Sequence, residues 1–498
     1  MKKTIVSFFI FIILMLLFIT LFSSCDFLEK LTKNIEKNFD KDLIQDVAKV
    51  ITGNTEHTHK YKYYYDGSEH WGFCESCAVL YDRETHEFTS RESVAATCEN
   101  IGYDVSFCSI CGYEKTVFEP QKAHEFQTVD GSELRECINC HKKESPLKEI
   151  PETERYGYLY LSSLEKSEIY LRIYKKFSAA VATGKETTEI EEQITRDELS
   201  DVYHCFSKDH PEYFWLSKRL KYVYSDTTIK SVELLYYLNG EYLSEAKIAF
   251  NKAADEVLAG ISSSMTDFEK ELYIHDYIVK TNQYDETQDA PLTHTAYAAL
   301  VYKRSVCDGY SSLFSYLLTR CGIQSAVLSG YSGENHSWNA VKIDGDWYMV
   351  DPTWDDPTGQ DVGQVLHTYF NCSWNVFSAD HSFEDPYGEK IENYYDVPEC
   401  TSEKYYYFTY FGYESELNAD DVERVVRAQI EKGQTEKFQI RIIGIEGTPE
   451  EKRNKIETFI SKNSDIFDVM ACALGKSSLL TLSYSVSIDG NVLTLFGK

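Results

Sequence analysis

The chain has 498 residues, of which 43% are hydrophobic and 26% charged, and this composition excludes a wholly disordered chain. Lysine plus arginine amount to 50 residues and aspartate plus glutamate to 80, so the net charge is −30. Such an acidic chain without a basic patch is repelled by nucleic-acid phosphates and anionic lipid headgroups, which excludes nucleic-acid binding and charge-driven docking on membranes.

The amino terminus has the pattern of an export signal over residues 1–25. Two lysines precede an apolar run at residues 5–22, and two serines separate that run from Cys25. A charged start, an apolar core and small residues at its end are typical of a secretory signal. The position of Cys25 resembles a bacterial lipobox, which implies lipidation of Cys25, although Phe22 stands where that motif usually has leucine. An uncleaved transmembrane anchor is the alternative, because the run is almost long enough to span a bilayer.

Residues 26–56 carry apolar side chains at helical spacing between charged ones, which predicts an amphipathic helical stalk. With either kind of signal, the rest of the chain is expected to be exported and anchored to the outer face of the cytoplasmic membrane or to the cell surface. The membrane is therefore an expected partner, reached through the lipid or the amino-terminal anchor.

A cysteine- and histidine-rich segment occupies residues 57–145, with three Cys-x-x-Cys pairs and histidines between them. Two thiolates from a tight Cys-x-x-Cys turn and two further Cys or His ligands close a tetrahedral structural zinc site. Bound zinc then supplies folding energy to a segment with few core residues. The pattern resembles zinc-ribbon-like repeats. The predicted metal ligands are His70, Cys74, Cys77 and His86 in one set, Cys98, Cys108, Cys111 and His124 in a second, and Cys137 and Cys140 as a third pair without an evident fourth ligand.

Disulfides are the alternative for this segment, because an exported chain permits them. Residues 74–140, however, hold seven cysteines, an odd number, and histidines have no reason to recur in a disulfide scaffold. Zinc is therefore the favoured prediction, in a structural role, and no cofactor is expected for catalysis.

A nucleophile is predicted at the start of a helix. Leu313, Leu317 and Cys321 recur at intervals of four and Gly322 follows, which predicts an amphipathic helix with a glycine cap. Cys307 then lies at the amino end of this helix. Unpaired N–H groups and the helix dipole stabilise an anion there, which favours the thiolate form that acts as a nucleophile.

A hairpin further along the chain is expected to pair a histidine with an aspartate. Asp344 and Gly345 lie between two alternating runs, a strong signal of a two-residue turn. With that turn, residue 343 faces 346, and Asp351 shares one sheet face with His336 as a diagonal neighbour, about 7–8 Å away. A shift of one residue in register would separate the two side chains.

A cysteine at a helix start with a paired histidine and aspartate is the layout of a thiol acyl-transfer site. Cys307 is predicted to attack a carbonyl, His336 to form an ion pair with the thiolate and protonate the leaving amine, and Asp351 to hold the imidazole tautomer.

These stretches resemble the transglutaminase-like superfamily in its bacterial extracellular form. The motifs that carry the resemblance lie at 274–278, 282–285, 294–300, 306–310, 336–339 and 351–357, followed by 369–371 and 380–381. The resemblance implies a papain-like α+β core, a catalytic triad of Cys307, His336 and Asp351, and a thioester formed from an amide. Water as the acceptor then gives hydrolysis, and an amine gives transfer. The implied catalytic domain spans 150–398, with a helical upstream part at 150–262 and the core at 263–398.

Residues 400–498 are expected to form a separate small α+β domain, with elements in the order β-α-β-α-β-β. Asn418 and Thr448 have the pattern of helix caps, and Asp489-Gly490 that of a hairpin turn.

The sequence as a whole predicts an exported, membrane-anchored thiol enzyme that cleaves or transfers amide bonds of extracellular peptides or proteins. The alternative is a non-catalytic cell-surface binding or scaffold protein that retains the same fold.

Overall fold

The computed structural model describes residues 60–497 except 66–68, 75–79, 99, 120, 123, 130–133, 226–227, 289–291, 357–364, 436, 464–465, 467–481 and 488–489. The predicted signal with Cys25, the predicted stalk and Cys77 lie outside the described residues. No helix among the residues described is long and apolar enough to cross a membrane. The chain divides into two compact units, one with residues up to Val94 and Tyr103–Glu119, the other with Ala95–Gly102 and Pro120–Lys498.

The described part of the first unit consists of two three-stranded sheets. Strands β4 and β6 are exposed along their whole length, so these sheets bury few apolar side chains. The sheets have the orders β1-β2-β3 and β4-β5-β6, with strands at Tyr61–Tyr65, Glu69–Cys74, Leu80–Thr85, Phe88–Val94, Gly102–Cys108 and Glu114–Glu119.

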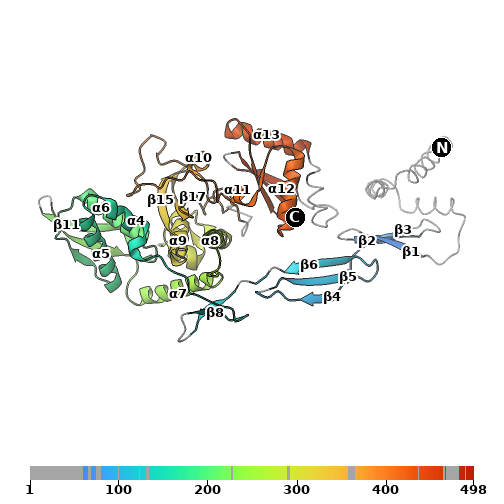
Figure 1. The fold of residues 1–498 in the computed structure, drawn as a ribbon, viewed down its shortest axis with the longest axis horizontal. Helices are drawn as coiled ribbons and strands as arrows, with labels where there is room; N and C mark the ends of the chain where they lie inside the picture. Colours follow the sequence, from blue (N-terminus) through green and yellow to red (C-terminus); the bar gives the residue numbers. More distant parts are fainter. Residues whose placement is uncertain are drawn as a thin grey trace. The chain divides into compact units, whose positions relative to one another are not determined.

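The second unit begins with a small sheet of β7, β8 and β9, followed by the segment upstream of the core. That upstream segment is not purely helical as predicted, because a three-stranded sheet in the order β10-β12-β11 accompanies its helices. Helices α4, α5 and α6 pack on one another (Figure 1). The small sheet spans Phe126–Thr128, Arg135–Cys137 and Lys143–Glu144, the helices α4 to α7 span Tyr156–Ser163, Ser167–Thr183, Arg196–Asp209 and Gly240–Leu258, and β10 to β12 span Thr187–Glu189, Leu216–Ser225 and Thr228–Tyr236.

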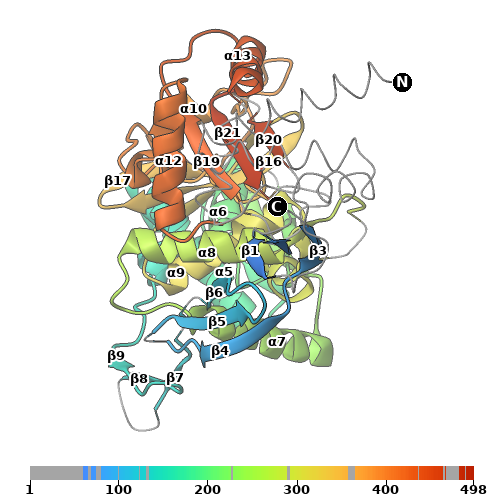
Figure 2. The ribbon, with the colours of Figure 1, turned by 90° about the vertical axis from the view of Figure 1, so that its right-hand side faces the viewer.

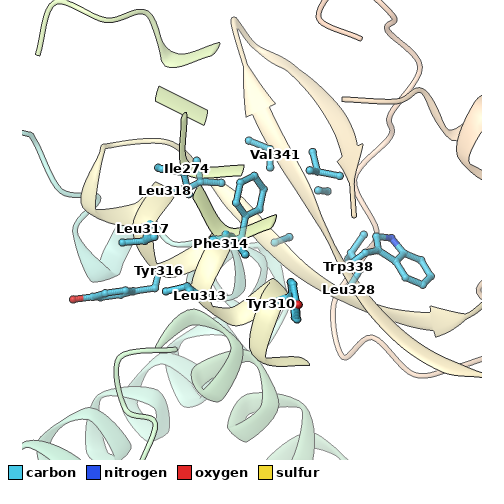
Figure 3. Close-up of a cluster of buried hydrophobic side chains, with 14 of the residues drawn as sticks. Ile274, Tyr310, Leu313, Phe314, Tyr316, Leu317, Leu318, Leu328, Trp338 and Val341 are labelled. Atoms are coloured by element: carbon cyan, nitrogen blue, oxygen red, sulfur yellow. The ribbon is translucent and has the colours of Figure 1, made fainter. Parts of the chain in front are cut away.

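The core packs two helices against an antiparallel sheet. Helix α8 (Asp267–Thr281) contacts α9 (Cys307–Arg320), which in turn lies on β15 (Ser325–Tyr331) and β16 (Asn335–Ile343). Phe314 of α9 lies between the helices and the sheet, near Ile274, Leu318 and Val341 (Figure 3), and is fully buried. This mixture of helix and sheet agrees with the predicted papain-like α+β core.

The hairpin of β16 and β17 (Asp346–Val350) has the predicted register. Ile343 pairs with Asp346 and Asn339 with Val350, so every facing pair follows from the two-residue turn. Asp344 and Gly345 both have positive φ, 52° and 94°, as a type I′ turn requires.

After a short helix that was not predicted, α11 (Tyr407–Phe411), the described residues of the last hundred show the predicted element order. Their sheet has the order β18-β19-β21-β20, and α12 packs against β19 (Figure 2). Their buried apolar side chains join the same hydrophobic cluster as the core around α9, so a separate small domain remains a prediction. The elements are β18 (Glu414–Ser415), α12 (Ala419–Glu431), β19 (Lys437–Ile442), α13 (Pro449–Lys462), β20 (Leu482–Val486) and β21 (Val492–Gly497).

Candidate active site

Cys307 is the first residue of α9 and is 9% exposed. Its neighbour Asp308 lies in the first turn, where a carboxylate complements the helix dipole. Asp308 is held by Lys218 Nζ at 2.8 Å and by His294 Nδ1 at 3.0 Å. These two side chains are about half exposed, so both lie at the surface beside the residue that follows the predicted nucleophile.

His336 on β16 lies beside Asp351, which follows directly after β17. The Nε2 atom of His336 is 2.6 Å from Oδ2 of Asp351, and both side chains are buried. Burial disfavours a charged imidazole, but the Asp351 carboxylate and a hydrogen bond with Cys307 raise the pKa of His336 to about 10. Because Nε2 is engaged by Asp351, Nδ1 is the ring nitrogen that remains for the thiol. The structure therefore brings together Cys307, His336 and Asp351, the three residues predicted from the sequence.

The Asp351 carboxylate is held on both of its oxygens. Oδ1 accepts the backbone N–H groups of Thr353 at 2.9 Å and Trp354 at 3.2 Å. Oδ2 accepts hydrogen bonds from Nε2 of His336 and, at 3.1 Å, from Nε2 of His381. Burial alone would raise the pKa of Asp351, but the two imidazoles hold it well below its usual range.

His381 is a fully buried second imidazole that the sequence assigned no role. Its Nδ1 lies 2.6 Å from Oδ1 of Asp380, whose Oδ2 accepts the hydroxyl of Tyr369 at 2.6 Å. Burial opposes its protonation, but Asp351 and Asp380 raise the pKa of His381. A line of hydrogen bonds thus runs from the predicted triad to Tyr369. His381 follows Asp351 by 30 positions, and no spacing rule predicts a contact across such a separation.

His275 is fully buried and belongs to a second cluster of hydrogen bonds. Its Nε2 is 3.1 Å from Oδ2 of Asp355 and its Nδ1 is 3.0 Å from Oδ1 of Asp276. The same Asp276 oxygen lies 2.9 Å from Nε2 of His367, while Gln439 donates to Nδ1 of His367. Since Nδ1 of His367 accepts a hydrogen bond, the ring proton is on Nε2, so hydrogen bonds satisfy this group without a metal ion.

The predicted metal ligands assemble in two groups, but not in the predicted sets. The first group is His70, His86, Cys108 and Cys111, and the second is Cys98, His124, Cys137 and Cys140. Within each group the four candidate donor atoms lie within 4.8 Å of one another, and the cysteines are free thiols. Each group thus lies within a single compact unit, the first in one and the second in the other.

The predicted sets differ from these groups because they joined the first two Cys-x-x-Cys pairs to ligands close in sequence and left the third pair without a further ligand. Cys108 and Cys111 are instead 3.9 Å and 3.4 Å from Nδ1 of His70 and His86, respectively. Cys98 joins the third pair, with 3.9 Å between its Sγ and that of Cys137. Cys74 is buried in β2 and belongs to neither group of described residues.

A comparison with protein families bears on the same residues. Residues 253–352, which include Cys307, His336 and Asp351, match the family model of the transglutaminase-like superfamily. The chain therefore contains a transglutaminase-like domain.

Known relatives of this transglutaminase-like domain share only part of their length with the chain. Kyphoscoliosis peptidase of Homo sapiens is 25% identical over 174 residues, which are 31% of this chain and 26% of that protein. Kyphoscoliosis peptidase of Mus musculus is 32% identical over 97 residues, 16% of this chain and 15% of that protein. The chain thus spans about a quarter or less of these relatives. The solved structure of a TGase is 14% identical, with a TM-score of 0.21, and the match covers 40% of this chain and 57% of that one.

Proposed function

We propose that this protein is a thiol enzyme that cleaves or transfers amide bonds of extracellular peptides or proteins. The observation that supports this proposal is the contiguous line of Cys307, His336 and Asp351, with the cysteine at a helix start and the imidazole between it and a buried carboxylate. Export and membrane anchoring rest on the signal-like segment and Cys25.

The reaction begins when the Cys307 thiolate forms a bond to the amide carbon. The backbone N–H of Cys307, at the first position of α9, is the proposed donor to the developing oxyanion. The C–N bond then breaks, and the proton on Nδ1 of His336 goes to the leaving amine. A thioester remains. Water or an amine attacks it and gives a proton to His336, and cleavage of the C–S bond restores the thiolate.

Asp351 fixes the imidazole for both proton transfers. Its Oδ2 accepts a hydrogen bond from Nε2–H of His336, which leaves Nδ1 on the side of the thiol. The carboxylate stays ionised because four donors hold it. It therefore stabilises the imidazolium without taking its proton.

The test is the pH dependence of Cys307 alkylation by iodoacetamide, followed by peptide mass spectrometry on residues 26–498. A free thiol becomes about tenfold less reactive for each pH unit below about 8.5. We expect Cys307 to stay reactive at pH 5 and the His336→Ala variant to lose that reactivity. Alkylation that follows a free thiol in both proteins would contradict the enzyme and favour the non-catalytic scaffold. A primary amine added with a peptide substrate then separates transfer from hydrolysis by the mass of the product.

We also propose that both Cys/His groups bind structural zinc. Zinc bonds of about 2.3 Å to sulfur and 2.0–2.1 Å to nitrogen give tetrahedral edges of about 3.8 Å between sulfurs and 3.6 Å between sulfur and nitrogen. The observed edges are 3.9 Å for Cys98 to Cys137 and 3.3 Å for Cys140 to His124, with 3.4 Å and 3.9 Å in the first group. Metal analysis of the purified protein is expected to find two zinc ions per chain from these groups, and a metal-free, folded protein would contradict it.

A further inference from the structure

The group of Cys98, His124, Cys137 and Cys140 lies in the same compact unit as the transglutaminase-like domain. Its ligands come from the small sheet of β7, β8 and β9 and the segments beside it. The buried apolar side chains of this small sheet are Cys98, Phe126 and Cys137, with Cys140 packed against them. So small a core does not hold a fold by itself, and three of its four members are candidate metal ligands.

The small sheet contacts the carboxyl end of α7. Arg135 on β8 donates to the carbonyl oxygens of Leu258 at 3.3 Å and Ile261 at 2.6 Å. The backbone N–H of Phe126 on β7 donates to the carbonyl of Ala259 at 3.4 Å. Carbonyls at a helix end lack intrahelical partners, and a guanidinium there also complements the helix dipole. The small sheet therefore caps α7 from outside.

Arg135 is fixed in this position by its neighbours. It forms an ion pair with Glu144 on β9, and both side chains are almost fully buried. The guanidinium also lies over the Phe126 ring, 4.9 Å from its centre. Ser262, just beyond α7, donates to the other Glu144 oxygen at 2.5 Å. Removing one partner of such a buried pair leaves the other charge without a counter-ion. The contact of Arg135 with α7 therefore depends on the structure of the small sheet, which places Glu144 beside it.

The metal ligands lie next to the residues that make this contact. His124 precedes Phe126 by two residues, and Cys137 follows Arg135 by two. Phe126 and Cys137 are cross-strand partners in the β7–β8 pair. A metal ion bound to His124 and Cys137 would close this strand pair and fix Phe126 and Arg135 against α7.

We propose that Cys98, His124, Cys137 and Cys140 form a zinc site whose occupancy stabilises the transglutaminase-like domain by holding Arg135 and Phe126 on the end of α7. The inference rests on the proposed zinc binding and goes beyond it, because it assigns the two zinc sites different roles. The chain from α7 leads directly into α8, which packs on α9 with Cys307. The site of His70, His86, Cys108 and Cys111 lies in the other unit, and its expected role is to stabilise the sheets of that unit.

The test compares three variants of the chain from residue 26 onward. Cys137→Ser removes a ligand of the second site, Cys108→Ser is the matched change in the first site, and Arg135→Gln removes the contact while leaving all ligands. For each, zinc content, the thermal midpoint of the unit that contains Cys307 and hydrogen exchange of peptides from 240–281 are measured.

We expect Cys137→Ser to lose one zinc, to speed exchange at 255–266 and to lower the midpoint by at least about 2–4 °C. Cys108→Ser is expected to lose one zinc without either change, and Arg135→Gln to keep two zinc ions while lowering the midpoint. If Cys137→Ser does not fold, the thermal midpoint of Arg135→Gln shows whether the contact of the small sheet with α7 stabilises the unit. If Cys137→Ser loses one zinc ion but keeps the wild-type midpoint and exchange rates, the proposed stabilisation is wrong, whereas zinc binding is supported. A wild-type protein without zinc would overturn both.

Discussion

The transglutaminase-like core and the Cys/His groups are stabilised by different means. Around α9, large side chains such as Trp338, Phe314 and Tyr348 are completely buried, so the hydrophobic effect suffices to hold the fold. Around the second metal group the core is a single phenylalanine among cysteines. The stability of the core is spread over many buried side chains, whereas that of the second metal group depends on a few ligand atoms. The predictions below test this difference, from the largest expected effect to the smallest.

Replacing Cys307 by alanine should reduce amide turnover by at least about 10³-fold, because the nucleophile is lost. Stability should change little, because the apolar core around α9 does not depend on this thiol. The measurement is turnover together with the thermal midpoint. Cys321→Ala, at the other end of the same helix, is the matched control and should keep its activity. Turnover by the Cys307 variant at the wild-type rate would contradict the proposed chemistry.

A zinc chelator should unfold the unit that contains His70 and Cys108, because its sheets bury few apolar groups. The core should stay folded at room temperature, and Cys307 should keep its reactivity. Limited proteolysis and Cys307 alkylation before and after chelation measure the two effects. Loss of Cys307 reactivity in a core that remains folded would contradict a purely structural metal.

Trp338→Ala should lower the free energy of unfolding of the core by about 3–5 kcal/mol, because a fully buried ring leaves a cavity. Denaturant unfolding measures it. The zinc content of the variant should equal that of the wild type, since the rings packed against Trp338, among them Phe377 and Phe383, belong to the core. Trp338→Phe is the milder control, and an effect as small as that of an exposed residue would show that the ring is not part of the core.

The contribution of the His336–Asp351 ion pair to the free energy of unfolding should fall as the pH rises from about 6.5 to about 10. The folded-state pKa of His336, about 10, lies above the ordinary value of 6.5. The ion pair with Asp351 thus contributes fully below pH 6.5 and is lost as His336 deprotonates. The measurement is the difference in denaturant midpoint between wild type and His336→Gln at pH 6 and pH 10, which also removes the contribution of other groups. If the wild type gains stability over His336→Gln as the pH rises, the prediction is contradicted.

Gly345→Ala should destabilise the core by about 1 kcal/mol, because residue 345 has a φ of 94° that alanine adopts poorly. No atom lies within 4 Å of the added Cβ, so backbone strain is the sole cause. Denaturant unfolding checks the value, and Gly345→Asn, which tolerates this conformation better, should recover part of the loss. An unchanged midpoint in the alanine variant would rule out the type I′ turn.

Local patterns carried most of what the sequence predicted correctly. The Asp344-Gly345 turn determines the register of β16 and β17, and that register alone places His336 beside Asp351. The cap of α9 and the element order after residue 414 are equally local. The grouping of metal ligands is not, because any Cys-x-x-Cys turn can bind histidines from several segments. The sheet of β10 to β12 and the contact of His381 with Asp351 also depend on packing between distant segments, which spacing does not encode.

The four hydrogen bonds to Asp351 limit which residues can replace it. Two backbone N–H groups occupy Oδ1, and they cannot reverse direction. An asparagine at 351 would therefore keep its oxygen there and turn its NH2 group toward His336 and His381. His336 would then have to present a bare Nε2 and carry its proton on Nδ1, where it could no longer accept one from Cys307. Although asparagine matches aspartate in shape, position 351 is closed to it for as long as the protein relies on this proton transfer.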